Sequence, residues 1–150
     1  MKILVAVDDS PHSERAVRFV ARMRWPAGSR VIVATVVTPQ ISPPGAGGES
    51  AVPLLIEVTE KQLKHAHAVV ASAEAKLREA GIATEERIRS GDPRDALLRL
   101  VGEERVDLLV LGSHGRTGLA KMLLGSVSSH AVTHARCSVL VVKEEGHDHA

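Results

Sequence analysis

Three glycines and one serine in the second half of the chain have the residue types and spacing of a phosphate-binding loop. Gly112 and Gly115 follow an apolar run that ends at Leu111, and Gly125-Ser126 opens a helical segment after nine intervening residues. Glycine carries no Cβ, so the backbone at Gly112 and Gly115 can take a positive φ and let a phosphate lie against its N–H groups. The amides of a helix N-terminus, with the Ser126 hydroxyl beside them, also favour an anion. The pattern predicts that two passes of backbone grip one polyphosphate.

Two other kinds of nucleotide-binding loop are excluded by the same sequence. It contains no G-x4-G-K-S/T motif, and no G-x-G-x-x-G follows the first apolar run. The first motif would indicate a P-loop and the second a standard dinucleotide-binding fold. The glycine loop therefore belongs to a different class of phosphate site.

Few side chains near this loop could assist chemistry on a phosphate. The evident candidates are Asp8, Arg116, Thr117, Lys121 and Ser126, with His114 as a further candidate for a base. Arg116 and Lys121 are expected to neutralise phosphate charge, although basic loop residues are equally often plain solvated side chains. His114 could instead face solvent or stack over the phosphates. No residue is evidently placed to activate water, so we expect slow hydrolysis at most.

Apolar runs and helix-start residues predict the order β-α-β-α-β-α-β-α-β. Residues 3–7 and 30–37 are rich in apolar and β-branched side chains, which is typical of strands buried on both faces of a parallel sheet. Ser10-Pro11 has the chemistry of an N-cap and first helical residue, and predicts a helix over 11–24. Right-handed crossovers then place helices on both faces of one sheet.

The middle of the chain combines a segment rich in proline and glycine with a long helix. Residues 38–56 are predicted to form a flexible loop, which could cover a bound ligand. An alanine-rich amphipathic helix is expected to begin near 54–57 and to run to residue 80, with Gly81 as its C-cap. His65 and His67 point to different sides of that helix, so we expect them at the surface and not on one metal ion.

The last third of the chain continues the same alternation. Residues 82–89 carry the charges of an edge strand, and Asp92 with the following proline starts a third helix. A fourth helix is predicted over 126–135 and a last strand over 138–142. The tail over 144–150 is expected to be disordered.

Length and composition indicate an ordinary globular chain. Its 150 residues suffice for one domain with a real core, and its net charge of +1 and aromatic content of 1% disfavour nucleic-acid binding. Cys137 is the single cysteine and is expected to be a packed small hydrophobe. His147 and His149 in the tail make a poor metal site because they have no fixed scaffold. With no signal peptide or membrane span in view, we expect a cytoplasmic protein.

The whole chain resembles the universal stress protein family. The ATP-binding signature of that family, G-x2-G-x9-G-S/T, is matched by Gly112, Gly115, Gly125 and Ser126. The likeness runs from K-I-L-V-A-V-D-D-S at the start to C-S-V-L-V-V-K near the end. It implies one α/β domain over residues 1–150, with an open twisted parallel sheet of five strands in the order 3-2-1-4-5. This is the Rossmann-like, adenine nucleotide alpha hydrolase-like fold.

The resemblance also implies an ATP-binding stress-response protein in which Mg2+ bridges the phosphates. Asp8 would lie at the ribose or the metal, although its position alone equally fits a turn or capping carboxylate. The backbone at Val36 would meet the adenine, and the strand order would bring Asp8 beside Gly112 at the switch point of the sheet. The residues expected at the nucleotide are Ala6, Val7, Asp8, Val36, Leu111, Gly112, Ser113, His114, Gly115, Arg116, Gly125, Ser126 and Val127.

The last strand would form an apolar edge of this sheet. An exposed apolar edge is a liability unless it is paired, and members of the family commonly pair it with a second copy. We therefore expect a homodimer formed through Val139, Leu140, Val141 and Val142.

Other functional classes fit the sequence less well. The runner-up is a nucleotide-independent dimeric interaction module, against which the intact glycine signature argues. An adenylyl-transferring enzyme of the wider superfamily would require an S-G-G-x-D-S type of loop, which Asp8-Asp9-Ser10 lacks. A flavoprotein would need an aromatic residue against the flavin, and only Phe19 or Trp25 could serve.

Overall fold

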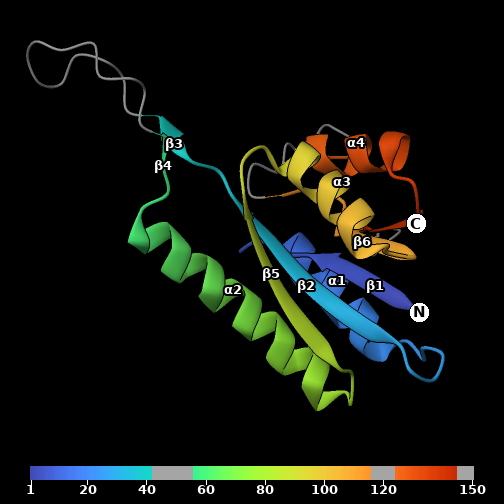
Figure 1. The fold of residues 1–150 in the computed structure, drawn as a ribbon. Coiled ribbons are helices and arrows are strands. Elements are labelled where there is room, and N and C mark those ends of the chain that lie inside the picture. The colour runs from blue at the N-terminus through green and yellow to red at the C-terminus, as the bar shows by residue number, and fades with distance from the viewer. Residues whose placement is uncertain (42–55, 116–123, 145–150) are drawn as a thin grey trace, which may run out of the picture.

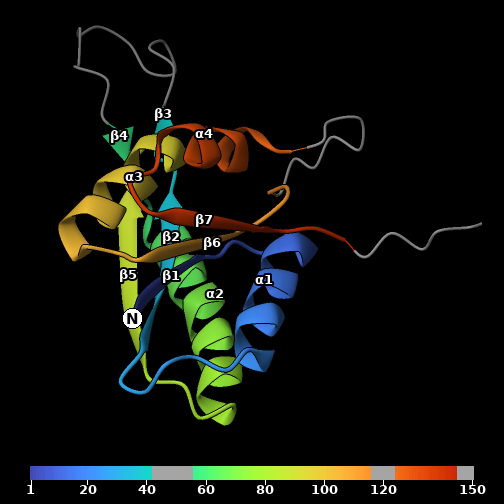
Figure 2. The ribbon, with the colours of Figure 1, turned by 90° about the vertical axis from the view of Figure 1, so that its right-hand side faces the viewer.

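The protein is described by a computed structural model of the 150-residue chain, which covers residues 1–41, 56–115 and 124–144. Its centre is one parallel sheet made of β1 (Lys2–Ala6), β2 (Arg30–Val37), β5 (Thr84–Ser90), β6 (Leu108–Gly112) and β7 (Ser138–Val142). The spatial order is β5-β2-β1-β6-β7, as Figures 1 and 2 show. Counted along the chain, this is the order 3-2-1-4-5, and the predicted fold is confirmed.

The middle strand β1 explains why the first apolar run is continuous. Leu4 pairs with Ile32 on β2 and with Leu109 on β6, and all three residues are fully buried. A strand that has neighbours on both sides and helices on both faces buries the side chains of its central residues, here Ile3, Leu4 and Val5. The core therefore fixes the position of the carboxyl end of β1, and with it the position of Asp8, which follows that strand.

Two helices cover each face of the sheet (Figures 1 and 2). On one face, α1 (Pro11–Arg22) and α2 (Glu60–Glu79) pack Val17, Val20 and Leu77 against β1, β2 and β6. On the other face, α3 (Pro93–Glu104) and α4 (Ser126–His134) contribute Leu100 and Ala131 to a second core cluster.

The helix starts follow the predicted capping chemistry. Ser10 accepts a hydrogen bond from the Ser13 amide at the start of α1, and Asp92 accepts one from the Arg94 amide at the start of α3. The long helix α2 begins later than predicted because Thr59 and Gln62 form a reciprocal capping box there. After α2, Gly81 takes a positive φ of 79°, as its predicted C-cap role requires.

Two short strands lie within the segment that the sequence predicts to be irregular. β3 (Gln40–Ile41) and β4 (Ile56–Glu57) pair antiparallel and form a small ribbon apart from the main sheet. The predicted loop over 38–56 is thus regular at its two ends, and residues 42–55 lie outside the described residues. At the C-terminus, Glu144 pairs with Arg15 at 2.6 Å, while the rest of the predicted disordered tail lies outside the described residues.

Candidate functional site

A cavity of about 570 Å³ opens at the carboxyl ends of β1, β2 and β6. This volume lies in the usual range for small-molecule sites. α1, which follows β1, packs on one face of the sheet, and α4, which follows β6, packs on the other face. The chain therefore leaves these two neighbouring strands in opposite directions, and a crevice lies between them. A crevice of this kind is where open α/β sheets bind ligands.

The structure brings the sequence-predicted site residues together around this cavity. Its walls include Ala6, Val7, Asp8, Val36, Leu111, Gly112, His114, Gly115, Gly125, Ser126 and Val127. Ser113 does not line it, because its side chain is buried behind the loop with 4% exposure. Arg116, with Thr117 and Lys121, lies outside the described residues. The expected residues therefore share one place in the fold, whatever ligand occupies it.

Asp8 has the turn role that its position suggested, and its side chain also lines the cavity. Its Oδ1 atom accepts a hydrogen bond of 2.9 Å from the Ser10 amide, which is the turn role. Its other oxygen faces Gly115, since a Cβ placed on Gly115 would lie 3.1 Å from Asp8 Oδ2. One carboxylate oxygen thus holds the turn into α1 while the side chain as a whole lines the cavity.

The predicted reason for Gly112 is wrong. Among the described glycines only Gly28, Gly81 and Gly91 have positive φ, so Gly112 and Gly115 do not use the conformation that was expected of them. Instead, a Cβ on Gly112 would lie 2.6 Å from the carbonyl carbon of His12. Glycine is required there because the first turn of α1 packs directly on the end of β6.

The amide of Gly125 also has a different partner from the one expected. It donates a 2.7 Å hydrogen bond to the Ser113 carbonyl, which also accepts one of 2.9 Å from the Ser128 hydroxyl. The N-cap Gly125 has no side chain to offer the first-turn amides of α4. Those amides, at Ser126, Val127 and Ser128, belong to residues that line the cavity, and they lie at the positive end of the helix dipole.

A pair of histidines surrounds the buried Ser113 hydroxyl. His114 Nδ1 lies 3.1 Å from Ser113 Oγ, and His12 Nδ1 lies 3.4 Å from the same atom. The two imidazole rings are 5.2 Å apart and tilted by 53°. His114 is therefore held beside the cavity by the residue that precedes it and by the start of α1.

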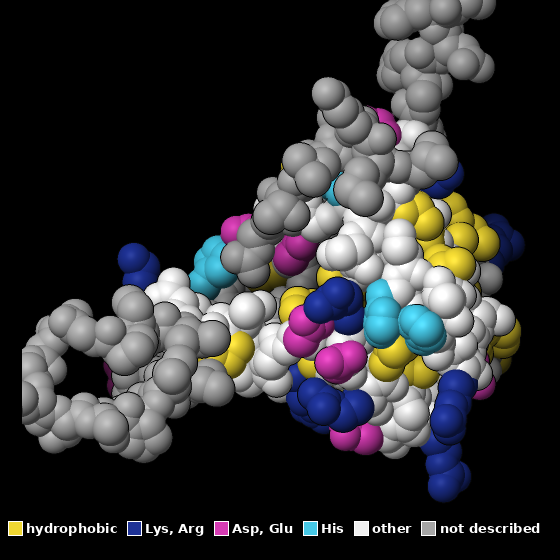
Figure 3. All heavy atoms as spheres, turned by 90° about the horizontal axis from the view of Figure 1, so that it is seen from above, with side chains coloured by type: hydrophobic (Ala, Val, Ile, Leu, Met, Phe, Trp, Pro, Cys, Tyr) yellow, Lys and Arg dark blue, Asp and Glu magenta, His cyan; other side chains and the backbone are white. Residues whose placement is uncertain are grey.

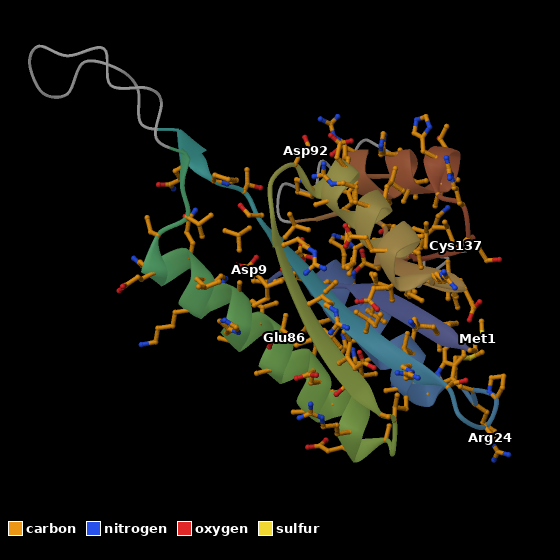
Figure 4. All side chains as sticks on the ribbon, viewed as in Figure 1. Met1, Asp9, Arg24, Glu86, Asp92 and Cys137 are labelled. Atoms are coloured by element: carbon orange, nitrogen blue, oxygen red, sulfur yellow. The ribbon has the colours of Figure 1, made fainter. Side chains whose placement is uncertain are left out.

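Sequence reasoning missed the contribution of α2 to the site. Gln62 and His65 line the cavity, and His65 Nε2 lies 3.2 Å from Asp9 Oδ2. His67 points elsewhere and lies 2.9 Å from a Glu86 oxygen on β5. Asp9 and Glu86, the partners of His65 and His67, lie beside different parts of α2 in Figure 4. The two histidines thus point to different partners. Only the packing of α2 on the sheet reveals that one of them reaches the cavity.

Both apolar and polar side chains line the cavity. Val36, Leu97 and Val127 belong to or pack against the core cluster beneath α3 and α4. Val7 and Val69, on the side of α1 and α2, also line it, together with Asp8 and Gln62. A ligand with one apolar part and one anionic part would suit this mixed lining.

Thiol chemistry and a metal site of three or more side chains have little support in the part of the chain that the structure describes. No group of three or more histidine, cysteine, aspartate or glutamate side chains there could hold a metal ion. Burial raises the pKa of the Cys137 thiol, and this side chain packs against the core beneath α3 and α4. A thiol with a raised pKa is a poor nucleophile, as expected for a packing residue.

No helix within residues 1–41, 56–115 and 124–144 has both the length and the apolar character needed to cross a membrane.

Comparisons with known proteins agree with the fold. A sequence profile of the universal stress protein family matches residues 1–143. Universal stress protein Sll1388 of Synechocystis sp. is 30% identical over 149 residues, covering 95% of this chain and 97% of that protein. A solved universal stress protein in complex with cAMP is 28% identical, with a TM-score of 0.68 and 95% of each chain covered. The universal stress protein from Archaeoglobus fulgidus in complex with dAMP is 25% identical, with a TM-score of 0.67, 95% of this chain and 98% of that chain covered. This chain therefore belongs to the universal stress protein family.

Proposed function

We propose that the protein binds an adenine nucleotide, ATP in particular, in the cavity at the carboxyl edge of its sheet. The observation that carries this proposal is the meeting of that cavity with the first turn of α4, whose N-cap provides no side-chain hydrogen bond. Amides at such a position favour a phosphate. The cAMP and dAMP complexes of two family members support the choice of an adenine nucleotide.

In this proposal different lining residues meet different parts of the nucleotide. The adenine lies near the backbone of Val36. The phosphates lie at the first-turn amides of α4, beside the Ser126 hydroxyl. Asp8 Oδ1 already accepts a hydrogen bond from the Ser10 amide. The other carboxylate oxygen would face the ribose or a phosphate-bound Mg2+. A bound Mg2+ would neutralise phosphate charge, and the described residues would supply at most the Asp8 carboxylate to it.

A Gly125→Val substitution tests the phosphate side of the proposal. A Cβ at Gly125 would lie 3.2 Å from His114 Cα and 3.3 Å from the Ser113 carbonyl oxygen, so the branched side chain should push the loop away from α4. We expect calorimetric titration to show loss of ATP binding, with circular dichroism unchanged. The matched control is Gly102→Ala on α3, where a Cβ meets no atom within 4 Å. ATP affinity that is the same in both variants would overturn the phosphate assignment.

The ligand itself is identified by mass spectrometry of small molecules released when freshly purified protein is denatured. We expect an adenine nucleotide, and heat on titration with ATP. Absence of both would favour the second candidate function, a nucleotide-independent interaction module. The apolar edge strand β7 is the observation that favours this alternative.

We also propose that the protein forms a homodimer in which β7 pairs with β7 of a second copy. Ser113 donates a backbone hydrogen bond to the Val142 carbonyl, so the backbone of Val142 faces β6 and that of Val141 faces outward. A Val141→Pro substitution removes an outward N–H and should give a monomer in analytical ultracentrifugation. A Val141→Ala control keeps the N–H and should stay dimeric. A Val141→Pro variant that remains dimeric would contradict pairing through this edge.

The cellular role that fits these properties is a nucleotide-dependent regulator in the stress response, acting in the cytoplasm and hydrolysing ATP slowly at most. ATP turnover measured over hours with purified protein checks the last point. Turnover at the rate of ordinary ATPases would instead assign the protein to an enzyme class.

A further inference from the structure

We propose that His130 and His134 on α4 form a binding site for one transition-metal ion of the Cu2+, Ni2+ or Zn2+ type. The two residues are four positions apart in an α-helix, which places them one above the other on the same side. Their ring centres are 4.4 Å apart and the ring planes are tilted by 51°. Figure 3 shows two histidine side chains next to each other on the face that α3 and α4 present.

The ring separation suits chelation of one ion. Imidazole nitrogens bind Zn2+ at about 2.0–2.1 Å, which places two nitrogens on one ion roughly 3 Å apart. Rings whose centres are 4.4 Å apart can bring one nitrogen of each to that separation by small side-chain rotations. His130 is half-buried and His134 is exposed, so solvent can reach the pair and supply the remaining ligands.

These two imidazoles have no competing partner within the residues that the structure describes, apart from each other. The other neighbouring histidines differ in this respect. His65 is paired with Asp9 and His67 with Glu86, and their spacing of two residues directs them apart. The α4 pair is thus the place on a described helix where two imidazoles converge without a carboxylate between them.

The donor set selects the kind of metal. Neutral imidazole suits copper, nickel and zinc, whereas magnesium and calcium prefer carboxylate and carbonyl oxygens. For a nitrogen site, divalent affinity rises from Mn2+ through Co2+ and Ni2+ to Cu2+. We therefore expect the strongest binding with Cu2+ and no competition from Mg2+. This site is separate from the nucleotide cavity and does not rest on the proposed function.

Metal binding would stabilise the helix that carries the site. α4 has nine residues, and most of them are serine, valine, threonine and histidine, which have only moderate helix propensity. A metal bridge from His130 to His134 holds one helical turn closed and adds a cation near the helix C-terminus, where positive charge is favourable. Any ion that binds the folded state alone also raises thermal stability.

The test is a titration of the untagged, metal-free, full-length chain with CuCl2, followed by calorimetry and electron paramagnetic resonance, without nucleotide. We expect one saturable site per chain, nitrogen couplings from two imidazoles, and a higher midpoint of thermal unfolding. The double variant His130→Asn/His134→Asn should lose this site, with affinity lower by at least the 10–100-fold that loss of a supporting group costs at metal sites. Each single variant should also weaken binding, because chelation needs both rings.

Two control variants distinguish this site from other histidines. His65→Asn/His67→Asn and His147→Asn/His149→Asn should both retain the copper site, and circular dichroism should show that every variant folds. Copper binding that survives the α4 double variant, or that is lost with the tail histidines, would overturn the proposal. So would the absence of saturable binding to the unmodified chain, or a single variant without effect.

Discussion

At the amino end of the sheet charged side chains pair with one another, whereas at the carboxyl end polar groups line a cavity. Arg87 on β5 donates to Glu104 at 2.6 Å and to Glu85 at 3.0 Å, and Lys2 reaches the Glu104 carbonyl at 2.7 Å. The Lys2 amide is held by Asp107 at 2.7 Å. In this network Lys2, Arg87, Glu85 and Glu104 each have a partner of opposite charge, so little of their charge remains to bind a ligand.

The carboxyl end has a different organisation. There, backbone amides, one carboxylate and two histidines surround about 570 Å³ of open space. Figure 4 marks the two ends, with Met1 and Cys137 on one side and Asp9 and Asp92 on the other. One end of the sheet thus stabilises the domain, and the other end is left available for function.

The largest change in unfolding free energy is expected at Gly112, where the cavity meets the core. Gly112→Ala places a Cβ 2.6 Å from the His12 backbone, and overpacking of this kind costs about 1–3 kcal/mol of unfolding free energy. The same change at Gly102, which is exposed within α3, should instead raise stability by about 0.5–1 kcal/mol. Urea unfolding of the two variants measures the expected loss of unfolding free energy at Gly112 and the expected gain at Gly102. Equal effects would mean that α1 does not rest on β6 as described.

A smaller effect is expected at the amino end. Arg87→Met removes the ion pairs to Glu104 and Glu85 but leaves each carboxylate a second basic partner, Lys2 or Arg30. The expected loss is about 1 kcal/mol, because no buried charge is left unpaired. ATP affinity should not change, since none of these residues lines the cavity.

The control for this variant is Arg89→Met, whose ion pair with Glu103 is more exposed. Its unfolding free energy should change less than that of Arg87→Met. A clear loss of ATP affinity in Arg87→Met would refute the separation of the two ends.

The smallest effect should appear on acidification. Hydrogen bonds from Arg30 and then Arg87 lower the pKa of Glu85 below its ordinary value of 4.5. A group whose pKa is lower in the folded state stabilises the fold above its unfolded pKa, and that stabilisation is lost as the pH falls through the folded value. Unfolding free energy should therefore decline below about pH 4.5, and Glu85→Gln should make the decline shallower. If unfolding free energy falls with pH equally steeply in the unmodified protein and in Glu85→Gln, Glu85 is not the source of the decline.

The sequence predicted the fold well because buried strands and capped helices leave local signals. Continuous apolar runs marked β1 and β2, and Ser10-Pro11 and Asp92-Pro93 marked helix starts. Charges along residues 82–89 marked β5 as an edge strand. Each of these signals depends on neighbours a few residues away, so it can be read without the tertiary structure.

The parts of the site that could not be predicted depend on long-range contacts. Gly112 is explained by His12, which is a hundred positions earlier, and the Gly125 amide is held by the Ser113 carbonyl. His65 reaches Asp9 only because α2 lies across the same face as α1. Glycine spacing indicates that backbones approach closely, but it does not say which backbone or ligand approaches.

The double hydrogen bond at the Ser113 carbonyl has a consequence for chain entropy. It fixes the points where the segment between Gly115 and Gly125 leaves and rejoins the fold, and the Gly115 nitrogen lies 3.7 Å from a Cβ built on Gly125. The two ends of this segment are thus held close to each other by residues that the structure describes. Lengthening a loop with fixed ends costs only about 0.6 kcal/mol for each doubling of its length. A guest sequence inserted there should leave the sheet register intact.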